Sequence, residues 1–443
     1  MAFEIGSAYG YLDLMDALKQ FVAGWPQHGA VTPTLTGNPE IKYIRAKGPV
    51  ATTPLETWTI VCTTGGGDGV AVFSVTGSTS GAQAAATAGT VYDNGIIRFL
   101  ITGPLAYNCV VGDQWVFTYA TGAMTTSTEA WTIKRDVSAN LNATGTQELI
   151  LAGPGAPAGT DEIFVGIANY HNSASDIYNW SLQGYTAYQA SEAFHEQPGA
   201  IPKAGWNGVG STLEVNTPFS TFVKDPNEID YWFVANGRRI IMAATFEAFF
   251  SVTYLGWILP YYTPAQWNYP LYIGGNASFD NDDVRYSDVN AYNQSFWFPM
   301  IDVLNTIEEA DHLSTGRIYT PGGDWRGFML GQGTKGDSIP AEVSAYQVDG
   351  FYPATVWPYF KRGMRKVTKN IDGTYPTWPI KLYDRMTLSA DPTVCFGVLD
   401  GIRAISGVDN QSENTFTDGG NTWLVVRSAN ETALEDYAAI ELN

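Results

Sequence analysis

The chain has 443 residues, of which 15% are charged and 14% are aromatic, and its formal net charge is −20. This length allows two or three domains with a large core. Nucleic-acid binding needs clusters of Lys and Arg that neutralise phosphates, so the acidic balance argues against that function. The charged fraction is well below the roughly 25% usual for soluble domains. Two explanations stay open: a surface largely buried in an assembly, or a β-rich fold with large cores.

Cysteine usage and hydropathy point to an intracellular origin without a membrane segment. Cys62, Cys109 and Cys395 have no metal-binding or redox spacing, and we expect each to be a small buried residue. A pairing of Cys62 with Cys109 stays open. The N-terminus lacks the pattern of a signal peptide. The most apolar run, 240–260, contains Glu247 and is rich in aromatic and β-branched residues, which favours buried strands over a membrane helix.

An amphipathic helix is predicted over residues 7–24. Apolar residues recur at three- and four-residue spacing between Tyr11 and Val22, which places them on one face. Ser7 can cap the start of this helix and Gly24 can end it. We expect the helix to dock on the main domain of the chain.

Residues 52–126 have the pattern of an inserted β module. The triplet Trp58-Thr59-Ile60 recurs as Trp131-Thr132-Ile133, and a nearly uncharged stretch rich in Gly, Ala, Thr and Val lies between the two copies. Alternating segments and turns predict about five strands in roughly 65 residues, a density typical of a small sandwich. Asn94-Gly95 favours a hairpin with a type I′ turn. Low-complexity linkers flank the stretch, so we predict an Ig-like β-sandwich at 52–126.

The rest of the chain is predicted to be antiparallel β. Asn236-Gly237 lies between two apolar segments and is the clearest hairpin signal. Strands also follow one another over 370–443, with a turn at Asp418–Asn421. The expected fold class is therefore mainly β and multidomain. A main domain of 1–51 and 127–369 carries the N-terminal helix, 52–126 is the inserted sandwich, and 370–443 is a C-terminal β region. A short helix is expected within 300–312.

Catalytic and metal-binding patterns are weak. Glu192, His195 and Glu196 cluster in one turn and could do acid–base chemistry, but no second group at the required separation accompanies them. We therefore predict no catalytic residue and no enzyme activity. The acidic run Asp280–Asp288 could supply oxygen ligands for Ca²⁺, but it lacks EF-hand spacing, so a solvated loop is the default. We predict no cofactor and no metal, and the Ca²⁺ question for this run stays open.

Aromatic residues gather in long irregular segments between 257 and 330. Such segments in compact proteins are usually functional loops. If exposed, the rings could stack on sugars as a glycan platform; otherwise they pack on each other or on a neighbouring subunit, which we favour because aromatics dominate interface energetics. The candidate interface or glycan platform consists of Trp257, Tyr261, Tyr262, Trp267 and Tyr269.

Several segments resemble one class of protein. The run Phe73–Thr87 and its continuation Tyr92–Gly95 resemble β modules that recur in tail and other virion proteins of tailed bacteriophages. The segments Gly159–Ile167, Tyr231–Arg239 and Asp436–Ile440 are similar to phage structural proteins. This resemblance implies a virion part, most often in the tail or baseplate, present in many symmetric copies. Its motifs are structural, so no functional residue is carried over.

The expected function is therefore that of a non-enzymatic structural component of a tailed-phage virion, made in the cytoplasm of the bacterial host. Its expected partners are other virion proteins and copies of itself, with no nucleic acid and no membrane insertion. The alternatives are a capsid decoration or neck protein, or a protein that binds or cleaves glycans on the bacterial surface.

Overall fold

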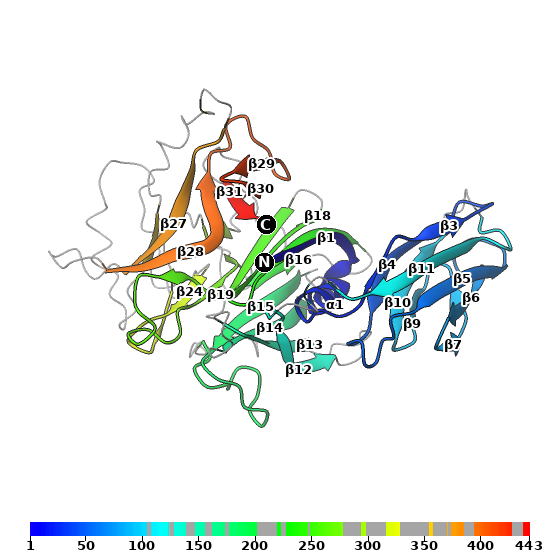
Figure 1. Cartoon of the computed structure of the whole chain (residues 1–443), viewed down its shortest axis with the longest axis horizontal. Helices are drawn as coiled ribbons and strands as arrows, with labels where there is room; N and C mark the ends of the chain where they lie inside the picture. The colour runs from blue at the N-terminus through cyan, green and yellow to red at the C-terminus, as the bar shows by residue number, and fades with distance from the viewer. Residues whose placement is uncertain are drawn as a thin grey trace. The chain divides into compact units, whose positions relative to one another are not determined.

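The computed structural model describes residues 1–103, 108–122, 124, 128–138, 147–155, 162–172, 177–201, 219–222, 227–246, 249–277, 294–297, 316–327, 354–357, 370, 374–384, 394–427 and 437–443. The chain is mainly β, as predicted, with several antiparallel sheets and the single helix α1, Gly10–Val22, in this described part (Figure 1). No helix among these residues is long and apolar enough to span a membrane. The helix expected within 300–312 lies outside the described residues.

The chain divides into two compact units. The first consists of Met1–Gly6 and Ile133–Asn443, and the second of Ser7–Thr132. These bounds differ from the domain boundaries that we expected. Residues 7–51 group with the β module rather than with the main domain, and residues 370–443 belong to the first unit rather than forming a separate region.

The Ser7–Thr132 unit contains a small β-sandwich in addition to α1. Its strands are β2 (Gln27–His28), β3 (Thr32–Thr34), β4 (Glu40–Ala46), β5 (Thr57–Thr64), β6 (Val72–Gly77), β7 (Gly81–Ala82), β8 (Ala86–Thr87), β9 (Val91–Asp93), β10 (Ile97–Thr102) and β11 (Gln114–Ala120). One sheet has the order β2-β11-β5-β6-β7, with β3 paired to β11 and β8 to β6, and the other has the order β4-β10-β9.

The pairing of β3 and β4 explains why the module is larger than expected. Strand β4 pairs with β10, with Ala46 opposite Ile97, and β3 pairs with β11, with Pro33 opposite Trp115. The buried core includes Ile44 from β4 together with Trp58 and Phe99. A sandwich made of residues 52–126 alone would therefore lack β2, β3 and β4 and part of its core.

The helix begins later than predicted and ends as predicted. Strand β1, Ala2–Tyr9, continues through Ser7, so Ser7 cannot cap the helix. The carboxylate of Asp13 instead accepts the backbone N–H of Tyr9 at 3.0 Å. At the other end Gly24 has φ of 63°, the left-handed conformation in which glycine commonly terminates a helix.

The described residues of the first unit form three sheets. The central sheet has the order β1-β17-β18-β19-β21-β24-β25, where β17 is Glu228–Ala235, β18 is Arg239–Phe246, β19 is Phe249–Trp257, β21 is Leu271–Gly274, β24 is Gly316–Tyr319 and β25 is Trp325–Gly327. A second sheet has the order β12 (Thr132–Ser138), β13 (Gln147–Gly153), β14 (Ile163–Asn172), β15 (Ile177–Tyr185), β16 (Phe219–Phe222), β22 (Asn276–Ala277) and β23 (Gln294–Ser295). The C-terminal sheet has the order β26 (Ala354–Trp357), β27 (Thr377–Asp384), β28 (Val394–Ile405), β31 (Tyr437–Glu441), β30 (Asn421–Arg427) and β29 (Thr415–Asp418), with β20 (Leu259–Pro260) paired to β28.

A core of this unit lies between the central and C-terminal sheets. It combines Trp232, Ile241 and Tyr254 of the central sheet with Leu382 and Phe396 of the C-terminal sheet. Such interdigitation of two inner faces is the packing of a β-sandwich. The strands of 370–443 therefore form one layer of a sandwich, and this is why they do not stand apart as a separate region.

The predicted hairpins are present, but two of their turns differ in type. Strands β17 and β18 pair around Asn236, and β9 and β10 pair around Asn94. Of these two Asn-Gly pairs, only Gly95 has a positive φ, whereas a type I′ turn needs two such residues. The Asn side chains shape both turns instead: Asn94 Oδ1 accepts the backbone N–H of Ile97 at 2.8 Å. The turn at Asp418–Asn421 does have positive φ at both central glycines.

Candidate functional site

The aromatic loop that joins β19 to β21 packs its central tryptophan into the protein. Trp267 is 3% exposed, and its indole N–H donates to the backbone oxygen of Tyr319 at 2.9 Å. Its ring makes an edge-on contact with Tyr262 and a tilted contact with Phe396, both at 5.6 Å between centroids. The ring of Trp267 thus packs against other rings of the protein and is not open to an external ligand.

The other four predicted platform residues differ in exposure. Tyr261 is 60% exposed, and Trp257, Tyr262 and Tyr269 are half-buried. Tyr269 makes an edge-on contact with Tyr319 at 6.4 Å. The structure therefore brings the loop aromatics together, but only Tyr261 offers most of its ring to solvent.

The acid–base candidates lie in an ordered loop after β15. The fully buried side chain of Gln197 donates to the backbone oxygens of Gln189 and Glu192 at 3.0 and 2.9 Å, which fixes the loop. His195 Nε2 lies 3.9 Å from a carboxylate oxygen of Glu196 at the surface. Glu196 is exposed, and Glu192 and His195 are half-buried.

Metal and cysteine candidates can be placed only in part. The acidic run Asp280–Asp288 lies outside the described residues. Among the residues that are described, no group of three or more His, Cys, Asp or Glu side chains is arranged to hold a metal ion. Cys62 and Cys109 are buried and carry free thiols. Burial, with smaller effects from Cys62, Asp113 and Asp68, raises the pKa of Cys109 to about 11, which keeps this thiol protonated at neutral pH.

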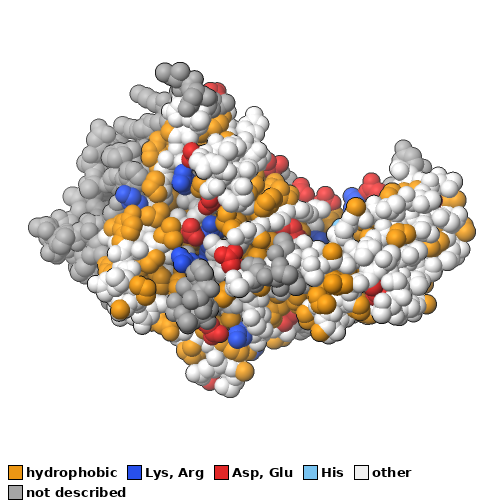
Figure 2. Space-filling model, viewed as in Figure 1, with side chains coloured by type: hydrophobic (Ala, Val, Ile, Leu, Met, Phe, Trp, Pro, Cys, Tyr) orange, Lys and Arg blue, Asp and Glu red, His pale blue; other side chains and the backbone are white. Residues whose placement is uncertain are grey.

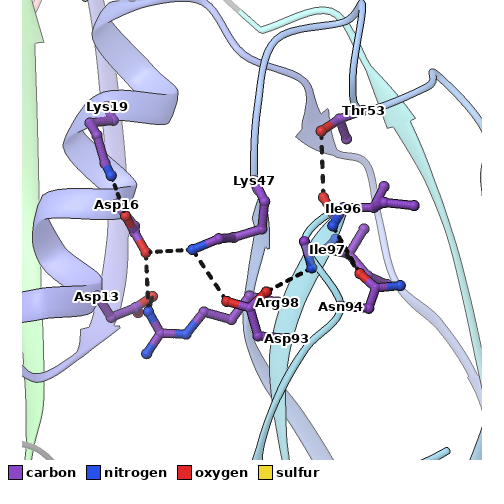
Figure 3. A network of polar contacts seen from close by, with 11 residues as sticks. Asp13, Asp16, Lys19, Lys47, Thr53, Asp93, Asn94, Ile96, Ile97 and Arg98 are labelled. Carbon is purple, nitrogen blue, oxygen red and sulfur yellow. Dashed lines mark hydrogen bonds and ion pairs between the residues drawn. The ribbon is translucent and has the colours of Figure 1, made fainter. Parts of the chain in front are cut away.

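A buried charge network in the Ser7–Thr132 unit joins the polar face of α1 to the sandwich (Figure 3). Asp16 lies at its centre: one carboxylate oxygen is 2.7 Å from Lys19 Nζ, and the other is 3.1 Å from Lys47 Nζ and 3.2 Å from Arg98. Asp13 lies 3.4 Å from the Arg98 guanidinium and 3.5 Å from that of Arg45. The helix is therefore attached to β10 and the end of β4 by its charged side chains.

The network shifts the pKa values of Asp16 and Lys47. Burial alone raises the pKa of Asp16, but Lys19, Lys47 and Arg98 outweigh it, so the net pKa lies well below the ordinary 3.8. Burial lowers the pKa of Lys47, but Asp16 and Asp93 outweigh this effect, and the net pKa lies above 10.5. Asp93 contacts Lys47 at 3.3 Å, at the β9–β10 turn. The directions of these two shifts keep Asp16 and Lys47 charged at neutral pH, and their ion pair acts as a structural clamp.

The part of the sandwich between Glu56 and Glu129 carries little charge. Between Glu56 and Glu129 the sequence contains only Asp68, Asp93, Arg98 and Asp113 as charged residues, and Arg98 and Asp113 are buried. In Figure 2 the face of this unit that is visible consists mostly of uncharged polar and hydrophobic groups. Such a surface differs from the charged surface of an ordinary soluble module.

One end of the sandwich exposes apolar side chains, and we call it the valine tip. It consists of Val70, Val110 and Val111, which are 60%, 38% and 63% exposed. Backbone hydrogen bonds join its two loops: Gly66 donates to Cys109 at 3.0 Å, and Cys109 donates to Gly66 at 2.8 Å. The valine tip therefore exposes apolar side chains on two loops whose backbones are hydrogen-bonded to each other.

Buried Asp113 holds the base of the valine tip. Its carboxylate accepts the backbone N–H groups of Val110 at 2.7 Å, Thr36 at 2.5 Å and Gly37 at 3.0 Å. Burial raises its pKa, but these hydrogen bonds outweigh burial and leave the pKa below 3.8. The side chain therefore stays ionised and ties together two loops that are far apart in the sequence.

No known protein-family model matches this sequence, and no similar curated protein was found. The candidate sites consequently rest on the residues themselves. Sequence reasoning missed the charge network, although Asp13, Asp16 and Lys19 recur at three-residue spacing on one helix face and so signalled it. The valine tip was also missed, although Val110-Val111 directly precedes the turn at Gly112-Asp113.

Proposed function

We propose that the chain is a non-enzymatic structural component of a tailed-phage virion, in the tail or baseplate, which assembles in symmetric copies through contacts with virion proteins. The observation that carries this proposal is the valine tip on an almost uncharged sandwich. Exposed apolar patches on soluble proteins commonly mark interaction sites. Loops held by Asp113 and by backbone pairing lose little freedom when a partner binds, which favours affinity.

The composition supports the same role. Contact surfaces are enriched in aromatic residues and depleted of Lys, Glu and Asp at their centres, and this chain has 25 Tyr, 14 Trp and few charges. The segments that resemble phage β modules, Phe73–Thr87 and Tyr92–Gly95, lie in the sandwich that carries the valine tip. A capsid decoration or neck protein would use the same kind of contact at another place in the particle.

Incorporation into particles tests this proposal. Particles are produced with the chain bearing Val111→Lys or Val70→Lys, and its copies per particle are counted by quantitative immunoblotting. The proposal predicts at least about a tenfold loss, because a charge enters an apolar contact. The matched control is Val137→Lys, which changes a valine that is 39% exposed on β12 and should leave incorporation unchanged. Normal incorporation of all three variants would contradict the proposal.

A second candidate function, binding of glycans on the bacterial surface, is favoured by one residue. Tyr261 is 60% exposed beside the half-buried ring of Tyr262, and exposed rings stack on sugar faces. Glycan-array binding that is lost on Tyr261→Ala would support this function. Trp267→Ala is unsuited to the test because that ring belongs to the core.

A further inference from the structure

The turn between β9 and β10 holds an Asn-Gly pair in an ordered arrangement (Figure 3). Asn94 Oδ1 accepts the backbone N–H groups of Ile96 at 3.0 Å and Ile97 at 2.8 Å. The first of these bonds closes a ring that contains both the amide carbon of Asn94 and the backbone nitrogen of Gly95. The oxygen of Ile96 accepts the backbone N–H of Lys47 at 2.9 Å. The side chain of Asn94 is therefore folded forward onto a turn that β4 helps to hold.

A carboxylate contacts the same glycine. Gly95 donates its backbone N–H to Asp93 Oδ1 at 2.9 Å, while Asp93 Oδ2 lies 3.3 Å from Lys47 Nζ. Asp93 and Gly95 are both exposed. Gly95 has φ of 79°, and a Cβ added to it would meet nothing within 4 Å. The glycine is therefore open to water and is paired with a carboxylate.

These contacts meet the requirements of an acyl transfer within the chain. A general base must lie within hydrogen-bond reach of the proton that it removes, and the Asp93 carboxylate lies so at the nitrogen of Gly95. Two N–H donors at about 3 Å from a carbonyl oxygen stabilise the negative charge that develops when a nucleophile attacks the carbonyl carbon. Ile96 and Ile97 supply two such donors to Asn94 Oδ1.

We infer that Asn94 is a site of self-modification, at which the chain converts its own asparagine to aspartate and isoaspartate. Asp93 removes the N–H proton of Gly95, and the freed nitrogen attacks the amide carbon of Asn94. The bond from this carbon to Nδ2 breaks, Asp93 passes the proton to Nδ2, and ammonia leaves a five-membered succinimide ring. Water then opens the ring at either carbonyl carbon, which gives aspartate or isoaspartate at position 94. The overall reaction consumes water and releases ammonia.

A second Asn-Gly pair in the described part of the chain shares only some of these features. Asn236 Oδ1 accepts the backbone N–H groups of Arg238 at 2.8 Å and Arg239 at 3.0 Å. The residue before it is Ala235, which has no carboxylate, and Gly237 is buried. The two pairs therefore have the same donors on the amide oxygen, but the adjacent base and the exposed glycine belong to the first pair. Asn236 is thus an internal control.

The modification would reach the buried charge network through Asp93. Aspartate at position 94 places a second carboxylate on the turn whose first carboxylate contacts Lys47 at 3.3 Å. Isoaspartate adds a backbone carbon between β9 and β10, which displaces Asp93 relative to Lys47. Lys47 also contacts Asp16 on α1 at 3.1 Å. Conversion of Asn94 should therefore loosen the attachment of the helix to the sandwich.

Peptide mapping of the purified full chain tests this inference. The folded chain is incubated at neutral pH in water labelled with heavy oxygen, so that only conversion during the incubation incorporates the label, and digests are analysed by mass spectrometry. Conversion at Asn94 should be at least about tenfold faster than at Asn236, because a general base typically contributes more than this factor. In the urea-unfolded chain the two sites should convert at similar rates, because only the dipeptide is then common to both.

Variants of the turn identify the base. Asp93→Asn keeps an oxygen that can accept the N–H of Gly95 but cannot take its proton, so it should slow conversion at Asn94 at least about tenfold. Conversion at Asn236 should stay unchanged. The matched control is Lys47→Met, which breaks the same ion pair but retains the carboxylate, and it should not slow conversion at Asn94. Circular dichroism confirms that each variant is folded, and the comparison of the two sites in the wild-type chain needs no variant.

Three outcomes would overturn the inference. The first is equal conversion of Asn94 and Asn236 in the folded chain, and the second is conversion at Asn94 that is indifferent to Asp93→Asn. The third is equal slowing by Lys47→Met and Asp93→Asn, because loss of the ion pair would then explain both effects.

Discussion

At the residue scale, the charged side chain of Asp16 holds helix α1 on the sandwich. Its carboxylate is nearly fully buried and contacts Lys19, Lys47 and Arg98, so its solvation is replaced by three cations. A buried ion pair contributes little to stability compared with apolar residues in place of both partners. Removal of one partner alone, however, leaves an uncompensated buried charge, which is strongly destabilising. Loss of this one carboxylate should therefore weaken the attachment of the helix to the sandwich.

Asp16→Asn tests that role. We expect the free energy of opening of the sandwich to fall by about 3–5 kcal/mol, because three cations remain buried with less negative charge. Hydrogen exchange of the β10 amides in the full chain measures it. The control is Glu40→Gln, which removes an exposed ion pair with Lys42 at 3.2 Å and should cost at most about 1 kcal/mol. Equal effects of the two variants would show that the network is not a clamp.

The difference in stability between wild type and Asp16→Asn should depend on pH in a way that follows from the direction of the pKa shifts. The pKa of folded Asp16 is below 3.8, so its stabilisation is fully present above pH 3.8 and is lost as the pH falls through the folded pKa. The pKa of folded Lys47 is above 10.5, so its stabilisation is present below pH 10.5 and is lost at higher pH. Wild type and Asp16→Asn should differ by a constant amount around neutral pH and converge as the pH falls below 3.8. Convergence near neutral pH would contradict this assignment.

Truncation of two aromatic residues in one loop should lower the free energy of unfolding by very different amounts. Trp267→Ala removes a ring from the core and should cost about 3–5 kcal/mol in unfolding free energy. Tyr261→Ala removes a ring that is 60% exposed and should change stability by about 0.5 kcal/mol or less. Urea unfolding followed by tryptophan fluorescence measures both. A stable Trp267→Ala variant would mean that the loop is not anchored by this residue.

At the element scale, local patterns predicted strands well where alternation and turn residues agreed. Trp58, Ile60 and Cys62 alternate with half-buried residues along β5, as predicted. The Asn-Gly turns show the limit of such reasoning, because a side chain that accepts backbone N–H groups replaced the positive φ angles at Asn236. The pairing of β4 with β10 spans about fifty residues of chain and has no local signature. This is why the sequence predicted the sandwich but not its first strands.

The extent of the smaller unit can be tested with fragments. A fragment of Ser7–Thr132 should fold on its own, because β3 and β4 complete the sheets, β4 contributes to the core, and α1 completes the charge network. A fragment of 52–126 should remain unfolded because Trp115 would lose its neighbour on β3 and Ile97 its neighbour on β4. Amide chemical-shift dispersion in NMR spectra distinguishes the two. A folded 52–126 fragment would restore the boundaries first expected from the linkers.

At the scale of the whole molecule, the candidate sites were predictable only in part. The sequence contains few charged residues, and charged side chains are sparse on the visible face of the sandwich (Figure 2). Which aromatic rings are exposed depends on packing between residues far apart, such as Trp267 with Phe396, and cannot be read from local sequence. The valine tip likewise depends on which backbones lie side by side.

The most direct test of the assembly role is the position of the chain in a particle. Purified phage particles that contain an epitope-tagged chain are labelled with gold-conjugated antibody and imaged by electron microscopy. The proposed function predicts several labels per particle at symmetry-related positions on the tail or baseplate. Absence of the label from intact particles, with the tagged chain remaining soluble in the lysate, would contradict it.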